Sequence, residues 1–197
     1  MSQIFGRHFD LVFRIALLGG IAFVIGLIAI WRIAIAPAVG APVQQPVPFS
    51  HKHHVGDVGL DCRYCHSTVD SSAYAGMPAS EVCMNCHSQL FTTSSLLAPV
   101  RDSVRDEKPL HWNRVYRLPD FVYFNHAVHV NNGIDCAKCH GDVARMPLTS
   151  QASSLEMRWC LDCHRHPQSA VDVASNAAKK PTLRQAAQLT ECSTCHR

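Results

Sequence analysis

The chain contains five copies of the pattern Cys-x-x-Cys-His, and these five copies include all ten of its cysteines. Two thiols three positions apart lie on one helical turn, where both can form thioethers with the vinyl groups of a porphyrin. The histidine that follows then directs its imidazole at the iron as the proximal ligand. The pattern therefore predicts five haem c groups. It occupies residues 62–66, 83–87, 136–140, 160–164 and 192–196.

The predicted site residues follow directly from this motif. The cysteines that attach haem are Cys62, Cys65, Cys83, Cys86, Cys136, Cys139, Cys160, Cys163, Cys192 and Cys195. The proximal iron ligands are His66, His87, His140, His164 and His196. Zinc ribbons, iron–sulfur sites and redox-active disulfides also use Cys-x-x-Cys pairs. None of them requires a histidine directly after every pair, so five such histidines favour haem.

The composition indicates what kind of core the protein has. Apolar residues make up 47% of the chain, but they are concentrated near its N-terminus. The rest is rich in His, Pro, Ser and Cys and poor in long apolar runs, so we expect the haems to serve as the core. The fold class expected is mostly α and coil, with short helices, long loops and little or no sheet. No basic stripe with interleaved aromatic residues is present, which disfavours nucleic-acid binding.

The apolar N-terminal stretch predicts a membrane anchor. Residues 15–31 carry no charge and lie between Arg14 and Arg32. With its snorkelling flanks, this run meets the length of a transmembrane helix, and Trp31 suits an interfacial position. A cleaved signal peptide is the alternative. The length of the run and the position of Arg32 favour an uncleaved, single-pass anchor.

The chain therefore divides into segments on two sides of a bacterial cytoplasmic (inner) membrane. Covalent haem attachment takes place on the outer side, so we expect the N-terminus inside and the haem domain in the periplasm. The predicted segments are a cytoplasmic N-terminus (1–10), a transmembrane anchor (11–36), a stiff Pro-rich linker (37–48) and a haem domain (49–197).

An internal repeat predicts the distal iron ligands. Phe-x-His-x-x-His begins at Phe49, before the first haem motif, and again at Phe124, before the third. Histidines at i and i+3 share one helical face, so each can reach a different iron as its sixth ligand. The repeat indicates a two-haem lobe (49–95), a connector (96–123) and a three-haem lobe (124–197). The predicted distal ligands are His51, His54, His126 and His129.

The fifth distal ligand is left open by this pattern. We favour Met146 or Met157, because both lie between the third and fourth motifs, and a His/Met haem has a raised potential. The other candidates are His53, His111, His166, Met77 and Met84.

The connector is the longest stretch without a haem motif. It predicts a short helix within 96–106, followed by an extended aromatic segment at 112–123. That segment either closes one lobe onto the other or forms a docking surface for a partner subunit. The sequence favours neither reading.

Phe-x-His-x-x-His followed by a haem motif resembles the cytochrome c3/c7 class. The order of several short sequence segments along the chain resembles that in the pentahaem cytochrome c subunit of alternative complex III, a bacterial quinol-oxidising complex. Those segments are FSHKHHVGD at 49–57, CRYCH at 62–66, CMNCH at 83–87, LPDFVYFNH at 118–126, MP at 146–147 and MRWCLDCHR at 157–165.

The resemblance implies an electron-transfer subunit, not a catalyst. Its implied partners are an iron–sulfur protein, a quinol-binding membrane subunit and a mono-haem cytochrome c. Its acceptor would be a periplasmic cytochrome c, a blue-copper protein or an oxidase. One alternative is a stand-alone quinol dehydrogenase of the NapC/NrfH type. Such proteins usually bind four haems and lack the two Phe-x-His-x-x-His motifs. Another is a catalytic multihaem reductase, which requires a five-coordinate haem.

Overall fold

The computed structural model describes residues 6–35, 39–167 and 188–196. The chain forms two compact units, Met1–Ala38 and Val39–Arg197. Residues 1–5 of the expected cytoplasmic segment, residue 36 of the anchor, and residues 37–38 of the linker lie outside the described residues. So do residues 168–187 and 197 of the three-haem lobe.

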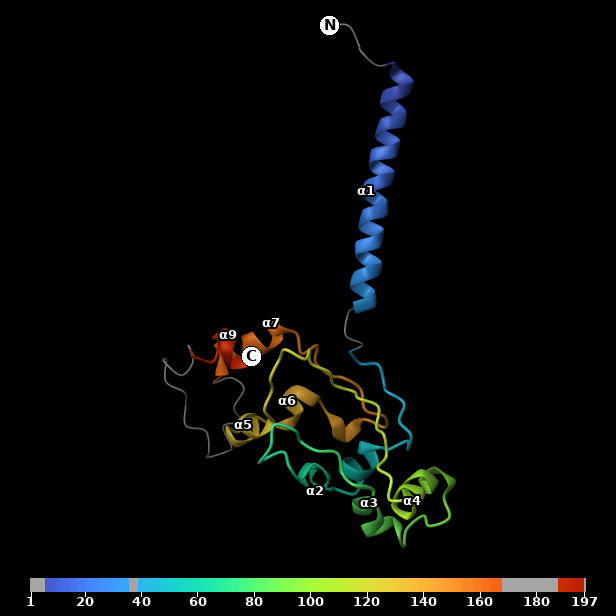
Figure 1. The fold of residues 1–197 in the computed structure, drawn as a ribbon, viewed down its shortest axis with the longest axis vertical. Helices are drawn as coiled ribbons and strands as arrows, with labels where there is room; N and C mark the ends of the chain where they lie inside the picture. The colour runs from blue at the N-terminus through green and yellow to red at the C-terminus, as the bar shows by residue number, and fades with distance from the viewer. Residues whose placement is uncertain (1–5, 36–38, 168–187, 197) are drawn as a thin grey trace. The chain divides into compact units, whose positions relative to one another are not determined.

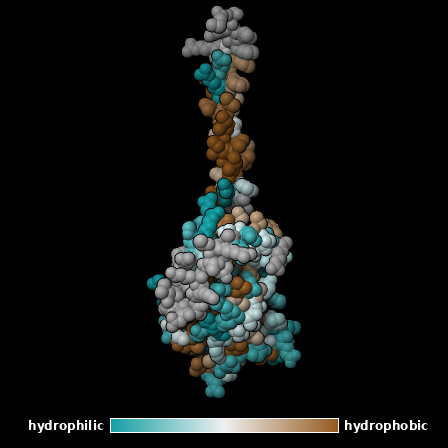
Figure 2. All heavy atoms as spheres, turned by 90° about the vertical axis from the view of Figure 1, so that its left-hand side faces the viewer, coloured by the Kyte–Doolittle hydropathy of each residue, from teal (hydrophilic) through white to brown (hydrophobic). Residues whose placement is uncertain are grey.

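The first unit is one long helix, α1, Arg7–Ile35 (Figure 1). Asp10 lies in its first turn and Arg32 in its last, where each charge is favourable to the helix dipole. Residues His8–Ala34 are long and apolar enough to cross a membrane. Apolar side chains cover the middle of this helix, with polar ones toward its ends (Figure 2).

The second unit consists of short helices and long loops, as the sequence predicts. The haem motifs lie on α2 (Cys62–Cys65), α3 (Ser80–His87), α6 (Cys136–His140), α7 (Met157–Arg165) and α9 (Cys192–Cys195). The other elements are α4 (Ala98–Arg105), α5 (His126–Asn131), the π-helix η1 (Lys52–Asp57) and the 3₁₀ turns η2 (Ser95–Leu97) and η3 (Val143–Arg145). The helix expected within 96–106 is α4.

The described residues form no β-strand, which confirms the expected fold class. They contain two isolated antiparallel bridges, Pro42 with Ser150 and Val122 with His196. The first bridge lies beside two further backbone bonds, from the Gly40 N–H to the Gln151 carbonyl at 2.8 Å and from the Val43 N–H to the Thr149 carbonyl at 3.0 Å. The described part of the Pro-rich segment therefore packs along the haem domain.

Side-chain caps begin two of the motif helices, one in each half of the repeat. Asp61 accepts a hydrogen bond from the Arg63 N–H at 2.8 Å, and Asp135 accepts one from the Ala137 N–H at 2.7 Å. These caps satisfy donors that a helix of four or five residues leaves free. The same aspartate-before-cysteine pattern thus produces the same local structure twice.

The polypeptide alone builds almost no core. Among the described residues, Val47, Val69 and Val100 are the buried hydrophobic side chains. All ten cysteines are free, so disulfides do not substitute for a core. A domain of this length needs much more buried apolar area to offset its conformational entropy. The structure therefore fits the expectation that bound haems form the core.

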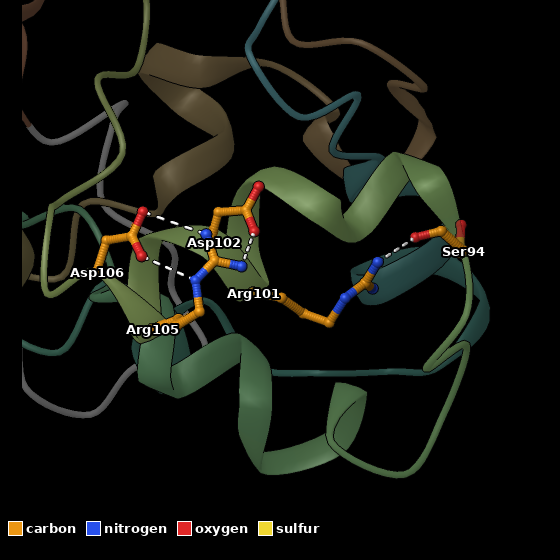
Figure 3. Close-up of polar contacts among 5 residues, drawn as sticks. All are labelled: Ser94, Arg101, Asp102, Arg105 and Asp106. Carbon is orange, nitrogen blue, oxygen red and sulfur yellow. Dashed lines mark hydrogen bonds and ion pairs between the residues drawn. The ribbon is translucent and has the colours of Figure 1, made fainter.

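Helix α4 secures the loop that follows the second motif. It packs against α3, and the Ser80 and Ser103 hydroxyls lie 2.6 Å apart across that contact. Figure 3 shows the Arg101 side chain extending from α4 to the Ser94 carbonyl, to which Nη2 donates at 2.9 Å. On the same helix, Arg105 forms exposed ion pairs with Asp102 and Asp106.

Candidate haem-binding sites

The two Phe-x-His-x-x-His turns have nearly the same geometry. The Phe49 ring lies 4.8 Å from the His51 ring, edge to face, and 4.4 Å from the His54 ring, stacked. The Phe124 ring lies 4.8 Å from His126 and 4.4 Å from His129 in the same two orientations. The phenylalanine thus sets the angle between the two imidazoles, and the sequence repeat is also a structural repeat.

Three of the predicted distal histidines face a predicted proximal histidine from a motif helix. The ring centroids are 6.1 Å apart for His54 and His87, 6.4 Å for His126 and His140, and 6.1 Å for His129 and His164.

These separations match two imidazoles on opposite sides of one iron. A metal–nitrogen bond is about 2.0 Å, and the nitrogen lies about 1.1 Å from the ring centre, which gives roughly 6.2 Å for the whole arrangement. The chain therefore holds its histidine rings where a bis-histidine haem requires them.

The fourth predicted distal histidine, His51, is influenced more by the charge of His66 than by that of any other motif histidine. Burial above all, and then the charges of His66, His54 and His140, lower the pKa of His51 to about 4. Burial likewise lowers the pKa of His140 to about 4 and lowers the pKa of His129. Neutral imidazole is the form that binds iron, so this burial favours the ligand state.

Hydrogen bonds fix the tautomer of most of these rings. Nδ1 of His54 lies 2.9 Å from the Ser50 carbonyl, and Nδ1 of His129 lies 2.8 Å from the Asn125 carbonyl. A carbonyl only accepts, so Nδ1 carries the proton and Nε2 presents its lone pair to a metal. The other Nδ1 acceptors are the carbonyls of Gly76 for His66, Leu90 for His87, Ala73 for His126, Leu189 for His164 and Phe121 for His196. Nδ1 of His51 instead lies 2.9 Å from the Thr149 hydroxyl, which can donate or accept.

Sequence reasoning missed these acceptors. A backbone carbonyl has no sequence signal, because every residue has one. It also missed Tyr116, whose ring lies 4.5 Å from the His140 ring, edge to face. No pattern singled out that tyrosine among the aromatic residues of the connector.

The cysteines show which motifs are neighbours. Burial and then the charge of Cys65 raise the pKa of Cys83, which places the first motif beside the second. Burial and then the charge of Cys62 raise the pKa of Cys136, so the first motif also adjoins the third.

The other half of the domain continues this row. Burial above all, and then the charges of Cys163 and Cys160, raise the pKa of Cys139 to about 11, so the third and fourth motifs are neighbours. Burial and then the charge of Cys195 raise the pKa of Cys160, which places the fourth motif beside the fifth. Along the domain, the motifs therefore follow the order second, first, third, fourth, fifth.

The remaining candidates do not converge on one iron. The His196 ring lies 5.8 Å from the Phe121 ring in a tilted orientation, and no predicted distal histidine pairs with His196 among the described residues. Met146 lies beside Gly141 and Ser150, next to the third motif. Met157, at the start of α7, is 66% exposed.

The geometry also bears on the other uses of a Cys-x-x-Cys pair. Within the part of the chain that the structure describes, no three His, Cys, Asp or Glu side chains converge as a metal site. The thiols instead lie in pairs on separate short helices, each beside one or two opposed imidazoles. That donor set fits a porphyrin with axial ligands better than it fits a tetrahedral metal.

Comparisons with known proteins agree with this geometry. Helix-borne Cys-x-x-Cys-His motifs and opposed histidines define a multihaem c-type cytochrome, an electron-transport protein, here with an N-terminal hydrophobic helix. More particularly, the family model for cytochrome c7 and related cytochrome c matches residues 47–103 and 122–197, and the chain belongs to this family. The two matched regions correspond to the two halves of the repeat.

One relative has a named role. The menaquinone reductase multihaem cytochrome c subunit of Nitratidesulfovibrio vulgaris is 31% identical over 156 residues. The match spans 78% of this chain and 68% of that relative.

Proposed function

We propose that the chain binds five haems c through its five motifs and conducts electrons between them. Each haem supplies one-electron iron(III)/iron(II) chemistry. The attaching cysteines are Cys62, Cys65, Cys83, Cys86, Cys136, Cys139, Cys160, Cys163, Cys192 and Cys195, and the proximal ligands are His66, His87, His140, His164 and His196. The observation that carries this proposal is the set of opposed histidine rings, 6.1–6.4 Å apart.

The distal ligands proposed are paired with particular motifs. His51 serves the first motif, His54 the second, His126 the third and His129 the fourth. Each His-x-x-His turn therefore holds two neighbouring haems at a fixed separation. A pyridine haemochrome assay and the intact mass of the purified protein test the stoichiometry, with five haems per chain expected.

For the fifth haem, we favour Met157 over Met146. Met157 lies on the same short helix as Cys160, whose pKa is raised by burial and then by the charge of Cys195 in the fifth motif. The contacts of Met146 are instead with residues beside the third motif. In the oxidised protein, a sulfur-to-iron band in the near infrared should be lost in Met157→Leu and kept in Met146→Leu. The reverse result would exchange the two roles.

The row of motifs supports conduction along the domain. The second and fifth motifs lie at its ends, so the chain can accept an electron at one end and deliver it at the other. With six-coordinate irons, no position is open for substrate, so the chain acts as a carrier, not as an enzyme.

The domain acts beside a membrane. In this proposal, α1 anchors the chain in a bacterial inner membrane, with residues 1–10 inside and the haem domain, 49–197, in the periplasm. The lobes 49–95 and 124–197 are then joined by the connector 96–123, and the segment 37–48 sets the distance to the anchor.

The proposed setting is a membrane complex that exchanges electrons with quinones. The order of the haem motifs and of the sequence segments between them favours a quinol-oxidising assembly of the alternative complex III type. There, the partners are an iron–sulfur protein, a quinol-binding membrane subunit and a mono-haem cytochrome c, and the acceptor is a periplasmic cytochrome c, a blue-copper protein or an oxidase.

A second function is favoured by the relative described above. A subunit of a menaquinone reductase would carry electrons in the opposite direction, toward the quinone. Both functions require the same haem row and the same anchor. They differ in which end of the row receives electrons.

The deciding experiment is a native gel of membranes solubilised in mild detergent, stained for haem. Parallel lanes are assayed for quinol:cytochrome c reduction and for menaquinone reduction by a reduced cytochrome. Haem and one of these activities migrating together in a large assembly supports the complex and gives the direction. A small haem band that takes electrons from quinol by itself would instead support a NapC/NrfH-type dehydrogenase.

A further inference from the structure

The first histidine of each Phe-x-His-x-x-His turn contacts a residue from the other half of the repeat. Nδ1 of His126 lies 2.8 Å from the Ala73 carbonyl in the first half. Nδ1 of His51 lies 2.9 Å from the hydroxyl of Thr149, which is 98 residues away in the second half. The second histidine of each turn instead uses the carbonyl four residues before it. The partner of His51 therefore differs from the other three in being a side chain.

The direction of this hydrogen bond follows from iron binding. If His51 binds iron through Nε2, as proposed above, its Nδ1 carries the ring proton and the Thr149 oxygen accepts it. An imidazole that donates its N–H in this way gains partial anionic character and becomes a stronger donor to iron. A stronger donor stabilises iron(III) relative to iron(II) and lowers the reduction potential. The Thr149 hydroxyl is therefore placed to fix the rotation of His51 and to lower the potential of its haem.

The linker holds Thr149 in this position. The Val43 N–H donates to the Thr149 carbonyl at 3.0 Å, and the Gly40 N–H donates to the Gln151 carbonyl at 2.8 Å. The antiparallel bridge described above lies between these two bonds. The loop therefore cannot move away from His51 without breaking backbone hydrogen bonds to the linker.

The turn that contains His51 is also fixed. Directly after this histidine, the Lys52 N–H donates to the Met146 carbonyl at 3.0 Å, in the segment that leads to Thr149. The Phe49 ring packs edge to face against the His51 ring at 4.8 Å. The histidine and the threonine are thus each held by contacts of their own, so their hydrogen bond orders no free side chain.

We propose that Thr149 is a positioning residue for the distal ligand of the first haem. Its hydroxyl holds the His51 ring and lowers the potential of the haem attached at Cys62 and Cys65, and linker residues 40–43 hold Thr149. This inference rests on the haem ligation proposed above. A side chain from the second half, between the third and fourth motifs, thereby adjusts a haem of the first half without changing its ligands.

The test is a potentiometric titration of the purified full-length protein, followed by electron paramagnetic resonance. The signal of the first haem is identified as the one lost in His51→Met. Thr149→Val removes the hydroxyl with little change in shape and should raise the first-haem potential by about 59 mV, a tenfold change in the ratio of oxidised to reduced iron. Thr149→Ser keeps the hydroxyl and should leave that potential unchanged.

Ser150 provides the matched control in the same loop. Its hydroxyl lies 4.0 Å from the Met146 sulfur. Ser150→Ala therefore removes a neighbouring hydroxyl and keeps the one that contacts His51. It should leave the first-haem potential unchanged.

A second variant acts on the support of Thr149, so that the proposal stays testable where Thr149→Val does not mature. Val43→Pro removes the N–H that donates to the Thr149 carbonyl, in an extended segment that already contains Pro42. The loosened loop should raise the first-haem potential in the same direction as Thr149→Val, but by less.

Three outcomes would overturn the inference. One is a Thr149→Val protein in which all potentials equal the native ones, and another is a Ser150→Ala protein with the same rise as Thr149→Val. A Val43→Pro protein with native potentials would overturn the role given to the linker. A native protein with fewer than five haems, or a His51→Met protein that keeps every bis-histidine signal, would instead overturn the ligation on which the inference rests.

Discussion

At the scale of single residues, the orientation of each imidazole is set by its neighbours. A phenylalanine sets the angle between the two histidines of each turn, and a backbone carbonyl sets the rotation of most rings. The paired rings therefore meet at different angles. The planes of His126 and His140 differ by 10°, those of His129 and His164 by 23°, and those of His54 and His87 by 68°.

These angles predict distinct magnetic signatures for the haems. Parallel imidazoles donate into the same iron d orbital and split its energy from that of its partner, whereas perpendicular imidazoles leave the two orbitals nearly equal. The oxidised protein should therefore show rhombic low-spin signals from the third and fourth haems. The second haem should show a more anisotropic signal with a larger maximum g value. Low-temperature electron paramagnetic resonance measures both.

A matched substitution assigns the second-haem signal. His54→Met leaves His87 in place and replaces one ring, so the most anisotropic signal should be lost while the rhombic signals remain. If a rhombic signal is lost instead, the pairing of His54 with His87 is wrong.

At the scale of elements, two short turns join the halves of the domain. The π-helix η1, which contains His54, packs against η3, which follows the third motif. The Lys52 N–H donates to the Met146 carbonyl at 3.0 Å across this contact. A Cβ atom on Gly56 would overlap the carbonyl oxygen of Ala144, so glycine is required for this close approach.

Gly56→Ala should therefore displace η1 from η3 and move His54 away from His87. We expect a cost of about 1–3 kcal/mol from overpacking and a high-spin fraction at the second haem. Denaturant unfolding and the high-spin resonance measure the two effects. Gly59→Ala is the control, because Gly59 has φ of +80° and open space around it. It should cost roughly 1–2 kcal/mol from backbone strain and leave ligation intact. High-spin iron in Gly59→Ala alone would contradict this explanation.

A second prediction concerns α4. The Arg101 guanidinium donates to the Ser94 carbonyl in the loop that also contains the Leu90 carbonyl acceptor of His87. Arg101→Ala should lower the free energy of unfolding by roughly 1.5–3 kcal/mol, the range for a charge-assisted hydrogen bond. Chemical denaturation measures this change.

Arg105 provides the matched control on the same helix. Its ion pairs with Asp102 and Asp106 are exposed to water, which screens them. Arg105→Ala should therefore have a clearly smaller effect than Arg101→Ala. Equal effects would mean that the contact with Ser94 does not stabilise the loop.

How much of this could be predicted depends on whether a feature repeats in the sequence. The haem motifs, the two histidine turns and the fold class follow from short patterns, because each pattern forms its own local structure. The neighbours of each motif do not follow, because they depend on contacts such as that between Gly56 and Ala144. The carbonyls that accept from the imidazoles, such as that of Gly76 for His66, have no sequence signal either, since every residue has a backbone carbonyl.

At the scale of the whole molecule, contacts between the two halves of the repeat bring the motifs together. The link between the first and third motifs, through Cys62 and Cys136, joins the two halves of the repeat. The His126 N–H and ring both reach the Ala73 carbonyl in the first half, at 3.2 Å and 2.8 Å. A distal ligand of one half is thus oriented by the other half, so the halves depend on each other.

The composition of the core gives a prediction for the whole domain. The three buried valines contribute only about 2 kcal/mol each, whereas ordering the backbone costs about 1–2 kcal/mol per residue. Without covalent haem, the domain should therefore be unfolded. The haem domain, 49–197, produced in a cytoplasm that cannot attach haem should show no cooperative unfolding and should be cleaved rapidly by protease.

The same segment exported and matured with haem is the control, and it should resist protease and unfold cooperatively. Zinc added to the haem-free chain should not restore folding. Each thiol pair lies on its own short helix, and these helices need large apolar groups of porphyrin size to pack around. A haem-free chain that folded with zinc would contradict both the proposed core and the proposed cofactor. Because haem provides the buried surface here as well as the redox centre, conduction and folding depend on the same side chains.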